Sequence, residues 1–148
     1  MAGQAPLANF EVPVQLKLSA LWIATMFVYV YVDILAFYKP GTVRDILDGR
    51  VWEFDITQGW ALGVLVLMTV PSLMVALSVL LPPRANRRTN LIVAALFAVV
   101  SFANPIGESW GFIFFGAAVE LVLVIAIFVT AWRWPRAAAR LPAVDQGT

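Results

Sequence analysis

Four long apolar stretches, separated by short polar connections, dominate the pattern of this 148-residue chain. They cover about residues 18–38, 60–81, 91–107 and 112–132. The hydrocarbon core of a bilayer, about 30 Å thick, is crossed by about 20 apolar residues in an α-helix. The pattern therefore predicts an all-α fold: a polytopic membrane protein in which four transmembrane helices form one antiparallel bundle, with residues 1–148 as a single domain.

The connections between the apolar stretches also carry structural signals. Residues 42–58 form the longest polar connection. Within it, Thr42 followed by Asp45 resembles a capping box, and Gly49 suits a helix C-terminus. We therefore expect a short interfacial helix at about residues 43–48, lying between the first two spans.

Prolines and a basic segment mark the remaining boundaries. Pro71 lies inside the second apolar stretch and should kink that helix. The segment PPRANRR, residues 82–88, is interpreted as a short basic loop, so that the third helix begins at Asn90 or Leu91. Asn104 followed by Pro105 is expected to end that helix, because the residue before a proline disfavours the helical conformation.

Composition supports a membrane protein and limits its chemistry. The chain is 61% hydrophobic and 13% charged, whereas soluble domains are about 45–50% apolar and about 25% charged. No basic run is dense enough for a nucleic-acid footprint, so membrane lipid is an expected partner and nucleic acid is not. Cysteine and histidine are both absent. Disulfides, thiol redox chemistry, His/Cys metal sites and His-ligated haem are thereby excluded, and no metal or cofactor is expected.

Lysine and arginine positions predict the orientation, because basic residues concentrate on the cytoplasmic side of a membrane protein. With both termini in the cytoplasm, the inner side carries Lys17, Arg84, Arg87, Arg88, Arg133, Arg136 and Arg140. The outer side then carries Lys39, Arg44 and Arg50. Aromatic belts are expected at the inner edge with Trp22, Trp132 and Trp134, and at the outer edge with Tyr38, Trp52, Trp60 and Trp110. Both termini are therefore expected to be cytoplasmic.

Two carboxylates interrupt the apolar stretches and are the main candidates for function. Asp33 lies about 8 Å and Glu120 about 12 Å below the outer ends of their helices, and no lysine or arginine lies within any predicted span. Intramembrane acids are costly and usually face a bundle interior, where they are paired, protonated or functional. Asp33 would either pair with Arg44 or Arg50, which favours a structural latch, or face Glu120, which favours a ligand- or proton-binding site.

The surroundings of the two acids can be read from helical spacing. One stripe of the first helix carries Trp22, Met26, Tyr29, Asp33 and Phe37. Tyr29 is the expected hydrogen-bond partner of the acids, and Gly116 leaves space one turn outward of Glu120. Such a pocket would suit a small polar or cationic ligand with an apolar body. Glu108 could rim the opening or be a solvated loop residue, and the aromatic stripe could be packing alone.

The stretch DILAFYKPG, residues 33–41, followed by a charged loop and three further apolar stretches, resembles a family of small four-span bacterial membrane proteins of unknown function. The resemblance covers nearly the whole chain. It implies a four-helix fold and a location in the bacterial inner membrane, and it implies no activity.

These observations favour a binding or transport component with a polar pocket in the outer half of the bundle, formed by Asp33, Glu120 and Tyr29 and gated or paired by Arg44, Arg50 or Glu108. The main alternative is a non-catalytic accessory or assembly subunit, in which the acids only fix helix packing. A homo-oligomer or a partner membrane subunit fits either hypothesis. A lipid-acting membrane enzyme with carboxylates as acid and base comes third, and no catalytic residue is assigned.

Overall fold

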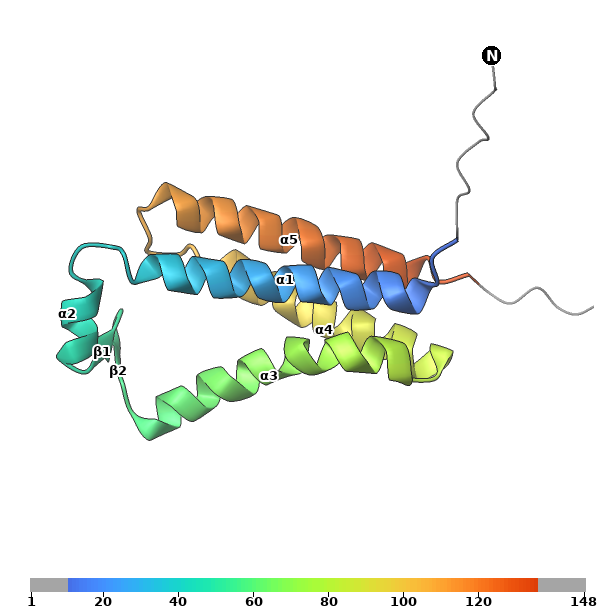
Figure 1. Cartoon of the computed structure of the whole chain (residues 1–148), viewed down its shortest axis with the longest axis horizontal. Helices are drawn as coiled ribbons and strands as arrows, with labels where there is room; N and C mark the ends of the chain where they lie inside the picture. The colour runs from blue at the N-terminus through green and yellow to red at the C-terminus, as the bar shows by residue number, and fades with distance from the viewer. Residues whose placement is uncertain (1–10, 136–148) are drawn as a thin grey trace, which may run out of the picture.

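Five helices and one short hairpin make up residues 11–135, the part of the chain that the computed structural model describes (Figure 1). The elements are α1 (Val14–Ala36), α2 (Thr42–Leu47), β1 (Arg50–Val51), β2 (Phe54–Asp55), α3 (Gln58–Leu80), α4 (Pro83–Ala103) and α5 (Gly111–Trp132). The four long helices run antiparallel in chain order, with α1 packed against α3 and α5, and α4 packed against α5. The predicted helical fold is thus present, with a hairpin that the sequence pattern did not indicate.

Three of these helices, α1, α3 and α5, are long and apolar enough to cross a membrane. The fourth long helix, α4, has 21 residues, but its first turns carry Arg84, Arg87 and Arg88 and its apolar part starts only at Leu91. The predicted count of four membrane-spanning helices is therefore not confirmed. What the helices indicate is a membrane protein.

The largest error in the predicted boundaries concerns the start of α4. Residues 82–88 were expected to form a loop, but α4 already begins at Pro83. Proline suits the first position of a helix because its missing N–H would have had no partner there. Only Leu81 and Pro82 therefore separate α3 from α4, and the basic segment is helical.

The connection between α1 and α3 contains the expected short helix, α2, but not its expected cap. Gly41, with φ of 93°, is the N-cap residue, and no side chain caps the first turn, so the proposed capping box of Thr42 and Asp45 is wrong. Gly49 follows the helix with φ of 80°, a left-handed conformation that glycine adopts without strain. The hairpin comes next, with Arg50 opposite Asp55 and Val51 opposite Phe54.

The core lies where α1, α4 and α5 meet, and it contains polar as well as apolar side chains. Its largest fully buried side chains include Trp22 and Phe97, whose rings meet edge to face. Trp22 was expected at the inner membrane edge. It is 0% exposed and donates a hydrogen bond to Asn90, so it is a core residue and does not face the lipid as a residue of an aromatic belt would.

Helix α3 covers only part of the bundle. It contains Pro71, which removes a backbone hydrogen bond and bends a helix, and Figure 1 shows α3 changing direction about halfway along. Its second half packs beside α1, while its first half diverges from it. Residues 61–66 are accordingly all exposed. Val30 and Asp33, in the second half of α1, are exposed as well.

The basic residues gather at the two ends of the bundle. One end, where α1 and α4 begin and α5 ends, carries Lys17, Arg84, Arg87, Arg88 and Arg133. Lys39, Arg44 and Arg50 lie at the opposite end, with α2 and the hairpin. Arg136 and Arg140, which also entered the orientation argument, lie outside the described residues. The cytoplasmic position of the termini stays a prediction.

Candidate functional site

Glu120 is the most unusual residue of the bundle. Its side chain, on the core-facing side of α5, is 0% exposed, and within residues 11–135 neither carboxylate oxygen has a hydrogen-bond partner. A buried polar group without a partner is destabilising, and a buried ionised carboxylate without one is far more so. The burial of Glu120 thus destabilises the fold, and residues that cost stability in this way are typical of functional sites.

Polar side chains from α4 and its C-terminal end surround this carboxyl. Ser101 and Asn104 lie close enough to act on it as hydrogen-bond donors, but neither approaches in the geometry of a completed hydrogen bond. The Ser101 hydroxyl lies 2.7 Å from the hydroxyl of Tyr29 on α1. Helices α1 and α5, together with the end of α4, therefore bring the buried Tyr29, Ser101 and Glu120 and the half-buried Asn104 into one cluster, the carboxyl cluster.

Sequence reasoning named two of these four residues. It chose Tyr29 as a partner of the acids, whereas Tyr29 is bonded to Ser101. It did not name Ser101, and it took Asn104 mainly for a helix terminator. The sequence does contain a pattern that indicates Ser101 and Asn104. One stripe of α4 and its C-cap carries residues that recur at helical spacing, namely Asn90, Ala94, Phe97, Ser101 and Asn104.

Asp33 lies beside this cluster but not inside it. It lies within electrostatic range of both Glu120 and Tyr29, yet its side chain is exposed. Helical spacing explains the position, because Asp33 follows Tyr29 by four residues and Met26 by seven, and Met26 contacts Ser72 of α3. Asp33 therefore lies on the side of α1 from which α3 diverges, and it is an exposed acid beside the carboxyl cluster.

The basic residues at the α2 end of the bundle are not paired with Asp33. Arg44 and Arg50 are exposed, and the salt bridge found within residues 11–135 joins Lys39 to Glu108, with Nζ and Oε2 2.6 Å apart. The expected pairing of Asp33 with Arg44 or Arg50 is thus not seen. Glu108 is thus a paired, largely shielded residue, and its ion pair connects the end of α1 to the turn between α4 and α5.

Gly116 has a different role from the expected one. A Cβ atom at this position would clash with Val32 of α1. The space one turn outward of Glu120 is therefore filled by a neighbouring side chain, and Gly116 lets α1 and α5 approach closely. It does not provide room for a ligand.

A second buried polar group, unpredicted from the sequence, lies toward the other end of the bundle. Asn90 Oδ1 accepts hydrogen bonds from Trp22 Nε1 at 2.8 Å and from Ser78 Oγ at 3.3 Å. The Asn90 amide donates to the backbone carbonyl and the side-chain oxygen of Asn86, and Asn86 donates to the carbonyl of Ser78. This asparagine network is satisfied by its own members, in contrast to Glu120.

No group of three or more His, Cys, Asp or Glu side chains that could hold a metal ion is found within residues 11–135. The chemistry available at the carboxyl cluster is that of a carboxyl group, two hydroxyl groups and an amide. These groups can bind a proton or hold a small polar or cationic ligand.

The fold and this cluster define a class: a small helical protein with three helices fit to cross a membrane and a buried, unpartnered carboxyl between them. The chain matches the family of unknown function DUF6326 over residues 8–139 and belongs to that family. The resemblance to a family of unknown function is thereby confirmed. No curated protein and no solved structure matches the chain.

Proposed function

We propose that this protein binds a proton or a small cation inside the membrane, at the carboxyl cluster of Tyr29, Ser101, Asn104 and Glu120. The observation that carries the proposal is the complete burial of Glu120 with both oxygens unpartnered. The proposed setting is the bacterial inner membrane, with all four long helices embedded and both termini in the cytoplasm.

The charge state of Glu120 follows from its surroundings. An ionised carboxylate in a dry interior must be neutralised, and the one basic residue within α1, α3 and α5 is Lys17, in the first turn of α1 at the end of the bundle away from Asp33. In the present conformation Glu120 therefore carries a proton. A monovalent cation or a ligand ammonium group would restore neutrality if it replaced that proton, so binding one and releasing the other are coupled.

The neighbouring hydroxyl and amide groups supply a path for the proton and hydrogen-bond donors for the Glu120 carboxylate. Either hydroxyl of the Tyr29–Ser101 pair can donate to the other. When Tyr29 donates, the Ser101 hydroxyl is able to turn toward Glu120, and Asn104 offers an amide to the ionised form. Asp33 lies beside the cluster, and its exposed carboxylate would attract cations.

The test is proton movement in liposomes. Purified protein is reconstituted with an internal pH-sensitive dye, and gradients of potassium, sodium or tetramethylammonium are imposed. We expect cation-driven proton movement above that of empty liposomes, lost in Glu120→Gln and reduced in Asp33→Asn. Glu53→Gln makes the same chemical change at an exposed hairpin position and should leave the rate unchanged. Rates equal to those of empty liposomes for every cation would contradict the proposal.

A second function, as an accessory or assembly subunit, is favoured by the exposure of Asp33 and of residues 61–66. A carboxylate on the outside of a membrane helix is costly until something covers it. A second copy of the chain or a partner subunit packed against this face would do so. Cross-linking in membranes between cysteines introduced at Asp33 and at Leu65 distinguishes this case, because cross-linked dimers form only if copies meet there.

A further inference from the structure

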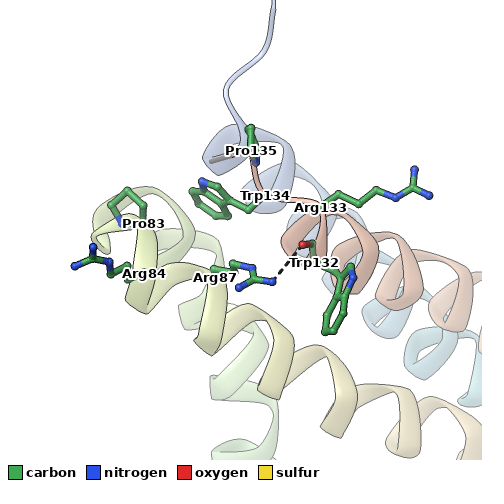
Figure 2. Close-up of a pocket in the computed structure, with 7 residues that line it drawn as sticks. All are labelled: Pro83, Arg84, Arg87, Trp132, Arg133, Trp134 and Pro135. Carbon is green, nitrogen blue, oxygen red and sulfur yellow. Dashed lines mark hydrogen bonds between the residues drawn. The ribbon is translucent and has the colours of Figure 1, made fainter. Parts of the chain in front are cut away.

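A groove lies at the basic end of the bundle, far from the carboxyl cluster (Figure 2). It has a volume of about 710 Å³ and is formed where α4 begins and α5 ends. Besides two prolines, its lining consists of Arg84, Arg87, Trp132, Arg133 and Trp134. Three cationic side chains and two tryptophans thus share one concave surface, the arginine groove.

Arg87 is held in place at the base of this groove. Its Nε donates to the carbonyl of Ala131 at 3.2 Å and its Nη2 to that of Trp132 at 3.3 Å. The guanidinium also lies 5.8 Å from the centre of the Trp132 ring, within cation–π range. Arg87 therefore caps the C-terminus of α5, and its remaining N–H groups are fixed before any ligand arrives.

The groove is positively charged, and no acidic side chain among the described residues neutralises it. No acidic residue lines it, and the salt bridge found in residues 11–135 lies at the opposite end, between Lys39 and Glu108. Arg84 and Arg133 are exposed, and Figure 2 shows them extending outward on either side. They are able to turn onto an anion that enters the groove. Guanidinium groups match phosphate oxygens in both charge and geometry.

An apolar stripe leads away from the groove along α5. Trp132 is 62% exposed, and Val129, Ile125 and Val122 continue from it at helical spacing on the exposed surface. An anion with long apolar chains would contact this stripe, whereas a soluble phosphate would leave it empty. Tryptophans at the junction of a basic and an apolar surface are typical of the level of lipid headgroups.

We propose that the arginine groove binds the headgroup of an anionic phospholipid, with the phosphate on Arg84, Arg87 and Arg133 and an acyl chain along the exposed stripe of α5. Basic pockets between membrane helices bind anionic headgroups in this way. The inference goes beyond the carboxyl cluster and does not depend on Glu120. It shares with the proposed function only the membrane setting.

Native mass spectrometry of the detergent-purified full chain tests the proposal. The chain is titrated with phosphatidylglycerol, with phosphatidylcholine of the same acyl chains, and with inorganic phosphate. We expect phosphatidylglycerol to bind most tightly, and the double variant Arg84→Gln/Arg133→Gln to bind it about tenfold more weakly. Arg87 is left unchanged because its removal would also uncap α5.

The matched control is Arg44→Gln/Arg50→Gln, which removes the same charge from exposed positions at the opposite end and should bind phosphatidylglycerol as the unmodified chain does. Equal binding of the two lipids would overturn the proposal. An equal loss in the control variant would also overturn it, because charge alone would then explain the binding. Competition by inorganic phosphate at the concentration of the lipid would assign the groove to a soluble anion instead.

Discussion

The hydroxyl groups of Tyr29 and Ser101 lie 2.7 Å apart in the buried interior, joining α1 to α4 directly beside the carboxyl of Glu120. Neither residue is charged, and the two are 72 positions apart in the chain. The pair gives the unpartnered acid a polar neighbour that is itself fixed by a hydrogen bond. The pair thus holds α1 against α4 and also forms one side of the proposed proton site.

Removing one hydroxyl of this pair should weaken both stability and proton movement. Tyr29→Phe deletes a buried hydrogen bond, so we expect a loss of about 1 kcal/mol in the free energy of unfolding. Thermal unfolding in detergent measures this loss, and the liposome assay should show slower proton movement. Tyr31→Phe is the control, because Tyr31 is 62% exposed. Equal effects of the two substitutions would show that the Tyr29–Ser101 bond has no special role.

Replacing Glu120 with an apolar residue should stabilise the protein and abolish proton movement. If the buried carboxyl is neutral and unpartnered, Glu120→Leu removes an unsatisfied polar group, and we expect a gain of about 1–3 kcal/mol. Proton movement should be lost in the same variant. Thermal unfolding and the liposome assay on one preparation provide both measurements. A strongly destabilised Glu120→Leu variant would mean that the carboxyl has a structural partner.

The same type of substitution at Asn90 should have the opposite result. Asn90 is as deeply buried as Glu120, but its amide is bonded to Trp22, Ser78 and Asn86. Asn90→Leu leaves the Trp22 N–H buried without a partner, so we expect a loss of about 2–3 kcal/mol. Thermal unfolding compared with Glu120→Leu makes the contrast explicit. Similar stability changes for the two variants would contradict the distinction between a satisfied and an unsatisfied site.

Glu120 could be singled out from the sequence, whereas the start of α4 could not. Long apolar stretches are enough to place α1, α3 and α5, and the rarity of acids in such stretches is enough to single out Asp33 and Glu120. Both signals are local. They depend on residue type and length, not on which helices become neighbours.

The start of α4 and the neighbours of Glu120 depend on contacts between distant segments. A basic segment such as residues 82–88 is expected in a loop, but here Arg87 caps the end of α5 and Asn86 donates to the carbonyl of Ser78. Those contacts favour helix, and they are invisible in the pattern of residues 82–88 alone. The pairing of Asp33 with Arg44 or Arg50, one of two alternatives for that acid, depends on such contacts too, and the salt bridge seen within residues 11–135 joins Lys39 to Glu108.

Close packing at Gly116 should make even one methyl group costly there. A Cβ atom would clash with Val32, so Gly116→Ala must push α1 and α5 apart, at a cost of about 1–3 kcal/mol. Gly63→Ala is the matched control, because no atom lies within 4 Å of a Cβ atom at that helical position. It should be neutral or stabilising by up to about 1 kcal/mol. Thermal unfolding of both variants checks the difference, and equal behaviour would show that the helices do not touch at Gly116.

The ion pair of Lys39 and Glu108 should hold the C-terminal end of α1 against the turn that carries Asn104. Its side chains are only 16% and 9% exposed, so the pair is better shielded than a surface ion pair, and we expect a coupling of about 1–2 kcal/mol. A double-mutant cycle of Lys39→Gln and Glu108→Gln, read by thermal unfolding, measures that coupling. Arg44→Gln, at an exposed position outside the pair, should change stability by less than about 0.5 kcal/mol. If the effects of the two pair substitutions simply add, the ion pair contributes no coupling, and the turn beside the carboxyl cluster is held by other contacts.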